Sequence, residues 1–179
     1  MASSTLPFNQ LAEQCQAAGL NAENAARIAS ELSRSFGVHD DEVAIFKLEQ
    51  AQLRFIYPPS LSNVGMIPLN HSTSVAARTA NTKRPEAINN FPQVRHANIF
   101  EAVPVDSRTR SQKPDQKPEK IAMPIQKMMS VPVIGPAGVL GVIQLSRKGS
   151  TPHAAGPDFQ HTDLQRLTAA ANVLAKCFK

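Results

Sequence analysis

The sequence predicts an α+β fold in which amphipathic helices at both ends of the chain flank two β-hairpins. The clearest hairpin covers Ile125 to Lys148, where two runs rich in β-branched residues surround the turn Gly135-Pro-Ala-Gly138. Gly138 can supply the positive φ that such a turn usually needs. Val, Ile and Leu occupy both parities of the second run, so both faces of this strand must be covered, as in a central strand between two layers.

The length and composition indicate one globular domain. A chain of 179 residues can form one domain with a full core and is too short for two of ordinary size. Hydrophobic residues make up 42% of it, and no apolar run is long enough to span a membrane. Residues 1–7 lack the basic and apolar regions of a targeting signal, so we expect a cytoplasmic protein. Residues 1–20 are predicted as an N-terminal extension helix and residues 21–179 as the domain.

The net charge of +5 is concentrated in one middle segment. Between Arg78 and Lys127 there are ten basic and five acidic residues, and the rest of the chain has nine of each. The absence of Trp, the single Tyr and the lack of a helix-turn-helix or zinc pattern argue against nucleic-acid binding. A solvated basic rim is the simpler interpretation of this excess.

Two helices are predicted at the N-terminus. The first covers residues 8–18 and ends at Gly19, and the second is capped by Asn21 and ends at Gly37. The apolar stripe of the first consists of Phe8, Leu11, Ala12 and Cys15. The apolar stripe of the second consists of Ala25, Ile28, Ala29, Leu32 and Phe36.

The first hairpin follows these helices. Residues 42–48 and 52–57 are its strands, and Pro58-Pro59 ends the second one because proline has no N–H to donate. The leading strand is apolar on both faces, like the second strand of the later hairpin.

Shorter elements are predicted in the middle of the chain. A helix capped by Ser72 or Thr73 runs through Val75, Ala76 and Thr79 toward Lys83. The other elements are brief strands at 66–69 and 86–89 and one helical turn within 98–103.

Residues 104–120 are predicted to form a mobile basic loop. They include three prolines, five basic and three acidic residues, with only Val105 apolar, so they cannot bury enough surface to offset the entropy of ordering. The strands on both sides need each other as sheet partners, so the loop lies inside the domain. It acts either as a lid over a ligand site or as an inert insertion.

The last helix has the most complete end signals. Phe159 at N′ can pack on Leu164 at N4, Gln160 is the N-cap, and Asp163 at N3 can accept from the free backbone N–H. The predicted stripe consists of Leu164, Leu167, Ala171, Leu174 and Phe178.

Three segments give the chain a close resemblance to the GAF domain, a sensory module. They read Met129-Ser-Val-Pro-Val133, Gly141-Val-Ile-Gln-Leu-Ser-Arg-Lys148 and Phe159-Gln-His-Thr-Asp163-Leu164. The resemblance runs from about Asn21 to Phe178. It implies an antiparallel sheet of about six strands, with the N- and C-terminal helices on one face and a small-molecule pocket under a helix and loops on the other.

The same resemblance implies which residues lie near that pocket. These are Arg78, Ile99, Phe100, Ser130 and Gln144. Ser130 and Gln144 are polar residues in apolar strands, so if they point inward they need partners. A ligand, a neighbouring side chain or a buried water would each satisfy them.

Departures from the family pattern narrow the function. Cyclic-nucleotide-binding members carry an Asn-Lys pair, then Phe, then Asp-Glu, whereas this chain has Arg147, Lys148, Phe159, Asp163 and Leu164 at the corresponding positions. The Asn and the Glu are missing, so cyclic-nucleotide binding is not expected. Lys148 and Asp163 are expected to form an ion pair that ties the hairpin to the last helix, worth about 0–1 kcal/mol if exposed.

No catalytic group or metal site is predicted. The five histidines share no ligand spacing, and no nucleophile has a base and an orienting group nearby in the pattern. Cys15 and Cys177 lie on apolar helix faces and are predicted as small core residues without activity. They are too few for a disulfide framework, which suits a reducing compartment. Family members that bind a linear tetrapyrrole need a Cys or His motif that is not found here.

The leading interpretation is a non-catalytic sensory or regulatory module in signal transduction. It would bind a small, anionic ligand, mediate dimerisation, or do both, and it would act on a separate output protein. A parallel homodimer through the N-terminal helices is expected, without nucleic acid, membrane or cofactor. The alternatives are an enzyme of the free methionine sulfoxide reductase type, which the positions of the two cysteines disfavour, and a ligand-free dimerisation scaffold.

Overall fold

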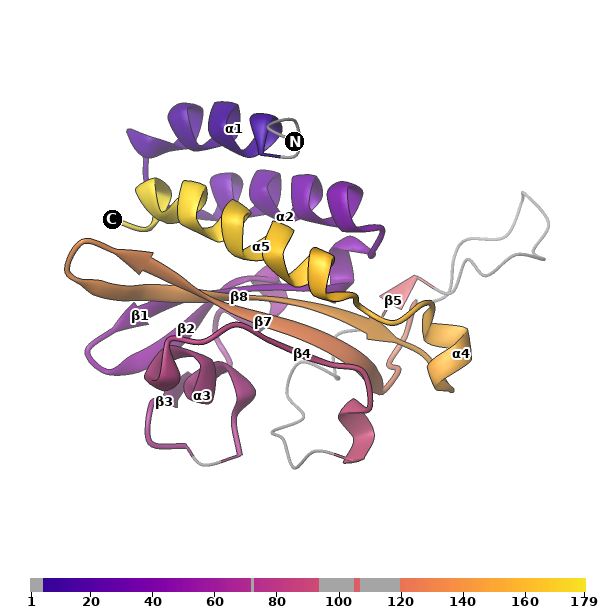
Figure 1. Cartoon of the computed structure of the whole chain (residues 1–179). Helices are drawn as coiled ribbons and strands as arrows, with labels where there is room; N and C mark the ends of the chain where they lie inside the picture. Colours follow the sequence, from indigo (N-terminus) through magenta and orange to yellow (C-terminus); the bar gives the residue numbers. More distant parts are fainter. Residues whose placement is uncertain (1–4, 72, 94–104, 107–119) are drawn as a thin grey trace.

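A six-stranded antiparallel sheet is the centre of the fold, in the strand order β3-β2-β1-β8-β7-β4 (Figure 1). The computed structural model of the chain describes residues 5–71, 73–93, 105–106 and 120–179. The predicted α+β class is confirmed, with the sheet between terminal helices on one face and a shorter helix on the other.

The two predicted hairpins are the four central strands of this sheet. The later one consists of β7 (Ile125–Gly135) and β8 (Gly138–Lys148), and Gly138 has a φ of +131°, which L side chains rarely adopt. The earlier one consists of β1 (Val43–Glu49) and β2 (Gln52–Tyr57). Pairing of β1 with β8 joins the two hairpins.

The brief strands lie at the two edges of the sheet. The predicted strand at 66–69 is β3 (Met66–Pro68), and the one at 86–89 is β4 (Glu86–Ile88). The backbones of β5 (Val105–Asp106) and β6 (Lys120–Ile121) pair in a separate two-stranded sheet at the ends of the predicted loop. The predicted turn within 98–103 and the remainder of the loop fall outside the described residues.

Helices cover one face of the sheet in two layers. Against the sheet lie α2 (Ala22–Phe36) and α5 (His161–Leu174), and α1 (Leu6–Gln16) packs on the outer side of both (Figure 1). The predicted stripes of α1 and α2 are buried. The remaining helical segments are α4 (Pro152–Ala155) and the 3₁₀ turns Asp40–Glu42, Pro59–Leu61, Phe91–Gln93 and Ala175–Phe178.

The predicted end signals of α2 and α5 are confirmed. The Asn21 side chain accepts a hydrogen bond from the Asn24 N–H at 2.8 Å, and Gly37 ends α2 with a φ of +61°. At α5 the Gln160 N–H donates to Asp163 Oδ2 at 2.8 Å. The α-helix ends at Leu174, and the 3₁₀ turn after it carries the predicted stripe on to the end of the chain.

The opposite face of the sheet is covered by α3 (Val75–Thr82). Its cap is Ser74 and not Ser72 or Thr73, because the Ser74 hydroxyl accepts from the Ala77 N–H at 3.1 Å. The sequence offers three hydroxyl residues in a row at this point. Starting the helix after the third one buries Val75, Ala76 and Ala80 against the sheet.

Side chains of the central strands alternate between two cores. Val43 and Ile45 of β1 pack with the terminal helices, whereas Ala44 and Phe46 pack with α3. This alternation explains why the central strands are apolar at both parities. None of the helices in the described part of the chain is both long and apolar enough to cross a membrane.

Two hydrogen bonds join the end of β4 to the start of α5. The Asn89 side chain accepts from the Phe159 N–H at 2.9 Å and donates to the Phe159 carbonyl at 3.1 Å. Phe159 is buried, and the Arg147 guanidinium lies 4.7 Å from the centre of its ring. Asn89 therefore satisfies both backbone groups of the residue that precedes the α5 cap.

Gly141 of β8 lies where the C-terminal turn presses on the sheet. A Cβ atom at this position would collide with the Phe46 carbonyl oxygen and lie 2.7 Å from the Phe178 ring. Phe178 is only 1% exposed, so the ring has no free space to move into. The position therefore requires glycine for space.

We expect Gly141→Ala to lower the free energy of unfolding by about 3 kcal/mol, because the added methyl group forces backbone and ring apart. Gly135→Ala in the same hairpin is the control, because its methyl group meets only the half-buried Leu140 side chain, which can rotate. Urea unfolding followed by circular dichroism measures both. Equal midpoints for the two variants would contradict the packing argument.

Candidate functional site

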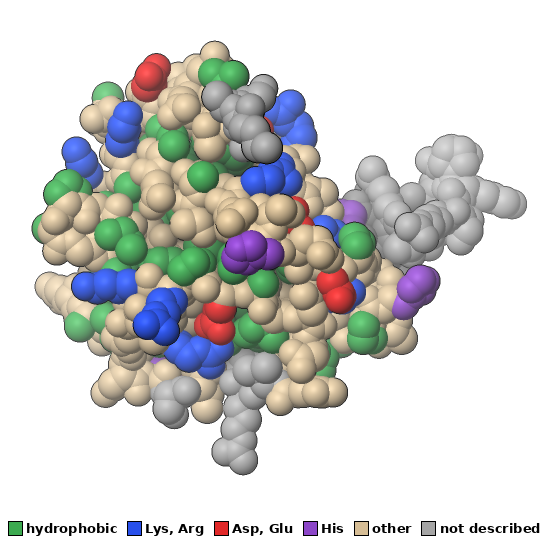
Figure 2. Space-filling view, viewed as in Figure 1, with side chains coloured by type: hydrophobic (Ala, Val, Ile, Leu, Met, Phe, Trp, Pro, Cys, Tyr) green, Lys and Arg blue, Asp and Glu red, His purple; other side chains and the backbone are tan. Residues whose placement is uncertain are grey.

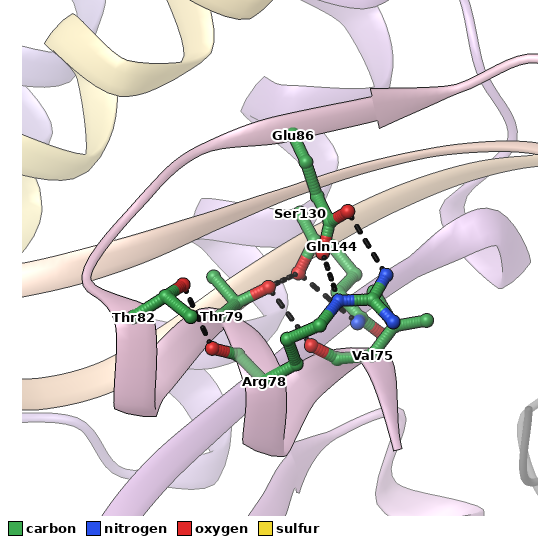
Figure 3. Close-up of polar contacts among 7 residues, drawn as sticks. All are labelled: Val75, Arg78, Thr79, Thr82, Glu86, Ser130 and Gln144. Carbon is green, nitrogen blue, oxygen red and sulfur yellow. Dashed lines mark hydrogen bonds and ion pairs between the residues drawn. The ribbon is translucent and has the colours of Figure 1, made fainter. Parts of the chain in front are cut away.

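The candidate site is a buried polar cluster between α3 and the strands β4, β7 and β8 (Figure 3). In the sheet, Glu86 of β4 lies opposite Ser130 of β7, and Ser130 lies opposite Gln144 of β8. Residues opposite each other on antiparallel strands point to the same face, so these side chains form a row beneath α3. Thr79 of α3 completes the cluster from the other side.

The hydroxyl and amide groups of the cluster form one chain of hydrogen bonds. Gln144 Nε2 donates to Ser130 Oγ at 3.2 Å, Ser130 Oγ and Thr79 Oγ1 are 2.7 Å apart, and Thr79 Oγ1 donates to the Val75 carbonyl at 2.9 Å. A hydroxyl has a single proton. Because the Thr79 hydroxyl gives its proton to the Val75 carbonyl, the Ser130 hydroxyl must donate to Thr79. All three hydrogen bonds therefore point in one direction, from the Gln144 amide to the Val75 carbonyl.

These hydrogen bonds satisfy the polar side chains of Ser130 and Gln144 that the sequence predicted to need partners. Both are buried, with exposed fractions of 0% and 4%. Ser130 is partnered by Thr79, and Gln144 is partnered by Ser130. The sequence placed Thr79 within this helix but did not predict its polar role. The signal was a hydroxyl residue at a core position, which demands a partner just as Ser130 does.

Apolar side chains surround the cluster. They include Phe46, Phe55, Phe91, Ile125, Met128 and Val142. Polar groups in such surroundings interact strongly with one another, and an unpartnered one is costly. The second amide hydrogen and the carbonyl oxygen of Gln144 are the groups with which this residue could also hold a ligand.

Arg78 lies at the margin of the cluster, one residue before Thr79. Its guanidinium donates two hydrogen bonds to the Glu86 carboxylate, from Nε at 3.0 Å and from Nη2 at 2.9 Å (Figure 3). The Arg78 side chain is 41% exposed and that of Glu86 is 30% exposed. The pair therefore lies at the border between the buried row and solvent.

Basic side chains gather on the surface around this border. Figure 2 shows several Lys and Arg side chains, with acidic ones among them, over the part of the molecule where α3 and β4 lie. Arg78, Lys83 and Arg84 are exposed there. A further excess of two positive charges falls in 107–119, outside the described residues.

None of the other predicted site residues is among the described members of this cluster. Ile99 and Phe100 lie outside the described residues. The Lys148 N–H donates to Glu42 Oε1 at 2.8 Å and its ammonium to the Asp41 carbonyl at 3.4 Å, while Asp163 accepts from the Gln160 N–H. The ion pair between Lys148 and Asp163 stays a prediction.

The two cysteines lie on the other side of the sheet from the cluster. Cys15 and Cys177 belong to the core beneath the terminal helices. Burial raises the pKa of the Cys177 thiol to about 11, and the neighbouring Cys15 thiol adds to this rise through charge and a hydrogen bond. Among the described residues, no group of three or more His, Cys, Asp or Glu side chains could hold a metal ion.

A family model described as GAF domain matches residues 22–178. It covers nearly all of the chain, including every strand of the six-stranded sheet and the helices α2, α3 and α5 that cover its two faces. The chain therefore belongs to the GAF domain family, as its resemblance predicted. A search of curated proteins found no matching sequence.

Solved structures share this fold. The GAF domain of a phosphoenolpyruvate-protein phosphotransferase from Acinetobacter is 12% identical, with a TM-score of 0.65 over 99% of this chain and 94% of that one. The free methionine-R-sulfoxide reductase from Neisseria meningitidis, in complex with its substrate, is 16% identical, with a TM-score of 0.58 over 99% and 91%. The GAF-B domain of DevS from Mycobacterium smegmatis is 13% identical, with a TM-score of 0.52 over 84% and 87%.

We expect Thr79→Val to lower the free energy of unfolding by about 1–3 kcal/mol, because it leaves the buried Ser130 hydroxyl without an acceptor. Thr82→Val is the matched control. Thr82 lies one turn later on α3 and makes the same bond to the carbonyl four residues earlier, but it is exposed, so its loss should change stability by less than about 0.5 kcal/mol. Urea unfolding compares the two, and equal losses would contradict the assigned role of Thr79.

Proposed function

We propose that this chain is a non-catalytic sensory or regulatory GAF module that binds a small, anionic ligand beside the Thr79–Ser130–Gln144 cluster. The observation that carries the proposal is the row of polar side chains on an otherwise apolar sheet face, with Arg78 at its open border. A few convergent polar groups in apolar surroundings are typical of small-molecule sites. The cluster supplies orientation, and the apolar residues around it supply buried contact area.

The contacts of Arg78 support an anionic ligand. Its guanidinium already holds a carboxylate, that of Glu86, through two roughly parallel hydrogen bonds. Because the pair is partly exposed, separating it costs only about 0–1 kcal/mol. A ligand carboxylate or phosphate can therefore replace Glu86 on Arg78 at little cost, and the positive charge nearby favours such a group.

Reductase activity is the second candidate function, because the structural relatives include free methionine-R-sulfoxide reductases from Neisseria meningitidis and Staphylococcus aureus. Reduction of a sulfoxide by thiols needs a cysteine that reaches the bound substrate. The only two cysteines of this chain are fully buried in the core beneath α1, α2 and α5, across the sheet from the proposed ligand site. Their position supports the non-catalytic module over the enzyme.

Signal transfer in this proposal requires an assembly. We propose a cytoplasmic parallel homodimer that pairs through the N-terminal helices and acts on a separate output protein. The exposed side of α2 carries Ala26, and α1 exposes Leu6, which is 55% accessible. Small and apolar residues on exposed helix faces suit close pairing between two copies.

We expect native mass spectrometry of the purified chain to show a bound small molecule, or binding of one from a panel of carboxylate and phosphate metabolites. Arg78→Gln should weaken that binding at least about tenfold, because it removes a bidentate contact to the anion. Arg84→Gln, which removes a nearby exposed charge, is the control and should change it little. If neither co-purified nor added compounds bind, the ligand proposal fails and the ligand-free scaffold remains.

We expect light scattering at tens of micromolar to give the mass of a dimer. Ala26→Arg should shift the chain to monomers, because it places a long charged side chain on the proposed pairing face. Ala137→Arg, at the exposed turn of the β7–β8 hairpin, should leave the dimer intact. A monomeric mass for the unaltered chain would remove the dimer proposal without affecting the ligand proposal.

A further inference from the structure

The two cysteines of the chain come from opposite ends of the sequence and meet in the core. Cys15 is in the last turn of α1, and Cys177 is in the 3₁₀ turn that follows α5. Both are fully buried as free thiols. The helix stripes predicted that each residue is buried, but they gave no indication that the two would be neighbours.

The contacts of Cys177 place it against α1. Its Sγ lies 3.7 Å from the carbonyl oxygen of Ala12. Ala12 precedes Cys15 by three residues on the same buried stripe of α1. The two thiols are electrostatic and hydrogen-bonding neighbours. The backbone around Cys15 is also fixed, because its carbonyl accepts from the Gly19 N–H at 2.9 Å.

We propose that Cys15 and Cys177 form a reversible intramolecular disulfide that fastens α1 to the C-terminal turn. In a reducing compartment such a bond is transient. It would therefore report the redox state of the compartment and would not be a permanent structural disulfide. The bond would join the outermost helix directly to the segment whose next residue, Phe178, packs on Gly141 of β8.

Local opening of α1 makes the reaction possible. The Thr5 side chain at its N-cap makes no capping hydrogen bond, and the helix has no acidic residue in its first turn and no basic residue in its last. It also forms the outer layer, away from the sheet (Figure 1). A short, uncapped outer helix detaches more readily than the core, and its detachment exposes both thiols together.

The surroundings of the two sulfur atoms assign their roles. Arg27 Nη1 donates to Cys15 Sγ at 3.8 Å, so a cation lies beside this sulfur when it attacks. The Cys177 thiol instead donates to the Ala12 carbonyl, and burial raises its pKa to about 11. Cys15 is therefore the attacking thiolate, and Cys177 completes the bond.

The reaction uses a low-molecular-weight disulfide as the oxidant. The Cys15 thiolate attacks one sulfur of that disulfide, which forms a mixed disulfide and releases one small thiolate. The Cys177 thiolate then attacks Cys15 Sγ and releases the second small thiolate, and the two small thiolates take up the two protons lost by the cysteines. Two protein thiols are oxidised and one disulfide is reduced to two thiols.

Oxidised glutathione is the probe for the full-length chain. We expect a mass loss of about 2 Da without a bound glutathione, and peptide mapping without reductant should recover the residue 15 and residue 177 peptides as one species. On a denaturing gel without reductant the oxidised chain should migrate as a single chain, not as a covalent dimer. It should melt roughly 5 °C or more above the reduced chain, since the bond closes nearly the whole sequence into a loop. Dithiothreitol should reverse both changes.

Variants test the assigned roles. Arg27→Gln should slow oxidation several-fold, whereas Arg34→Gln, an exposed change two turns further along α2, should not. In the Cys177→Ser variant the reaction should stop after its first step and leave a stable glutathione adduct on Cys15. A glutathione adduct that persists on the unaltered chain, a disulfide between two chains, or reaction only in denaturant would each overturn the proposal, and none of these outcomes bears on ligand binding at Gln144.

Discussion

The fold depends on the β7–β8 hairpin having both of its faces buried. Met129, Val131 and Val133 of β7 face the terminal helices, and Met128 on the alternate parity faces α3. A strand pair of this kind is stable only when a layer covers each side, so the terminal helices and α3 are required by the same two strands. Gly141 then sets how closely the C-terminal turn approaches, because the Phe178 ring occupies the space of its missing side chain.

The two faces of the sheet have different characters. The face under the terminal helices is closed mainly by apolar packing around β7 and β8, whereas the face under α3 carries the polar row that ends at Gln144. A hydrogen-bonded row inside an apolar core adds little net stability, because each bond replaces one to water. What it adds is directional specificity, since only one arrangement of α3 over the sheet satisfies all of its members.

The sequence predicted the elements well because each carries local signals. Asn21 and Gly37 bound α2, Asp163 caps α5, and Gly138 turns the central hairpin, and all of these act within a few residues. Contacts between distant elements were not predictable in this way. The partner of Ser130 is Thr79, and the neighbour of Cys177 is Cys15, and no spacing along the chain encodes either meeting. The helix cap at Ser74 was missed because Ser72 and Thr73 carry the same local signal, and packing against the sheet decides among the three.

The two hydrogen bonds between Asn89 and Phe159 join the edge of the sheet directly to the start of α5. β4 is only three residues long and lies at the edge of the sheet, where it pairs with β7 alone. Glu86 at one end of β4 forms an ion pair with Arg78 of α3. Asn89, just past the other end, forms hydrogen bonds with the backbone N–H and carbonyl of Phe159. The same short strand is therefore tied by side chains to α3 on one face of the sheet and to the start of α5 on the other.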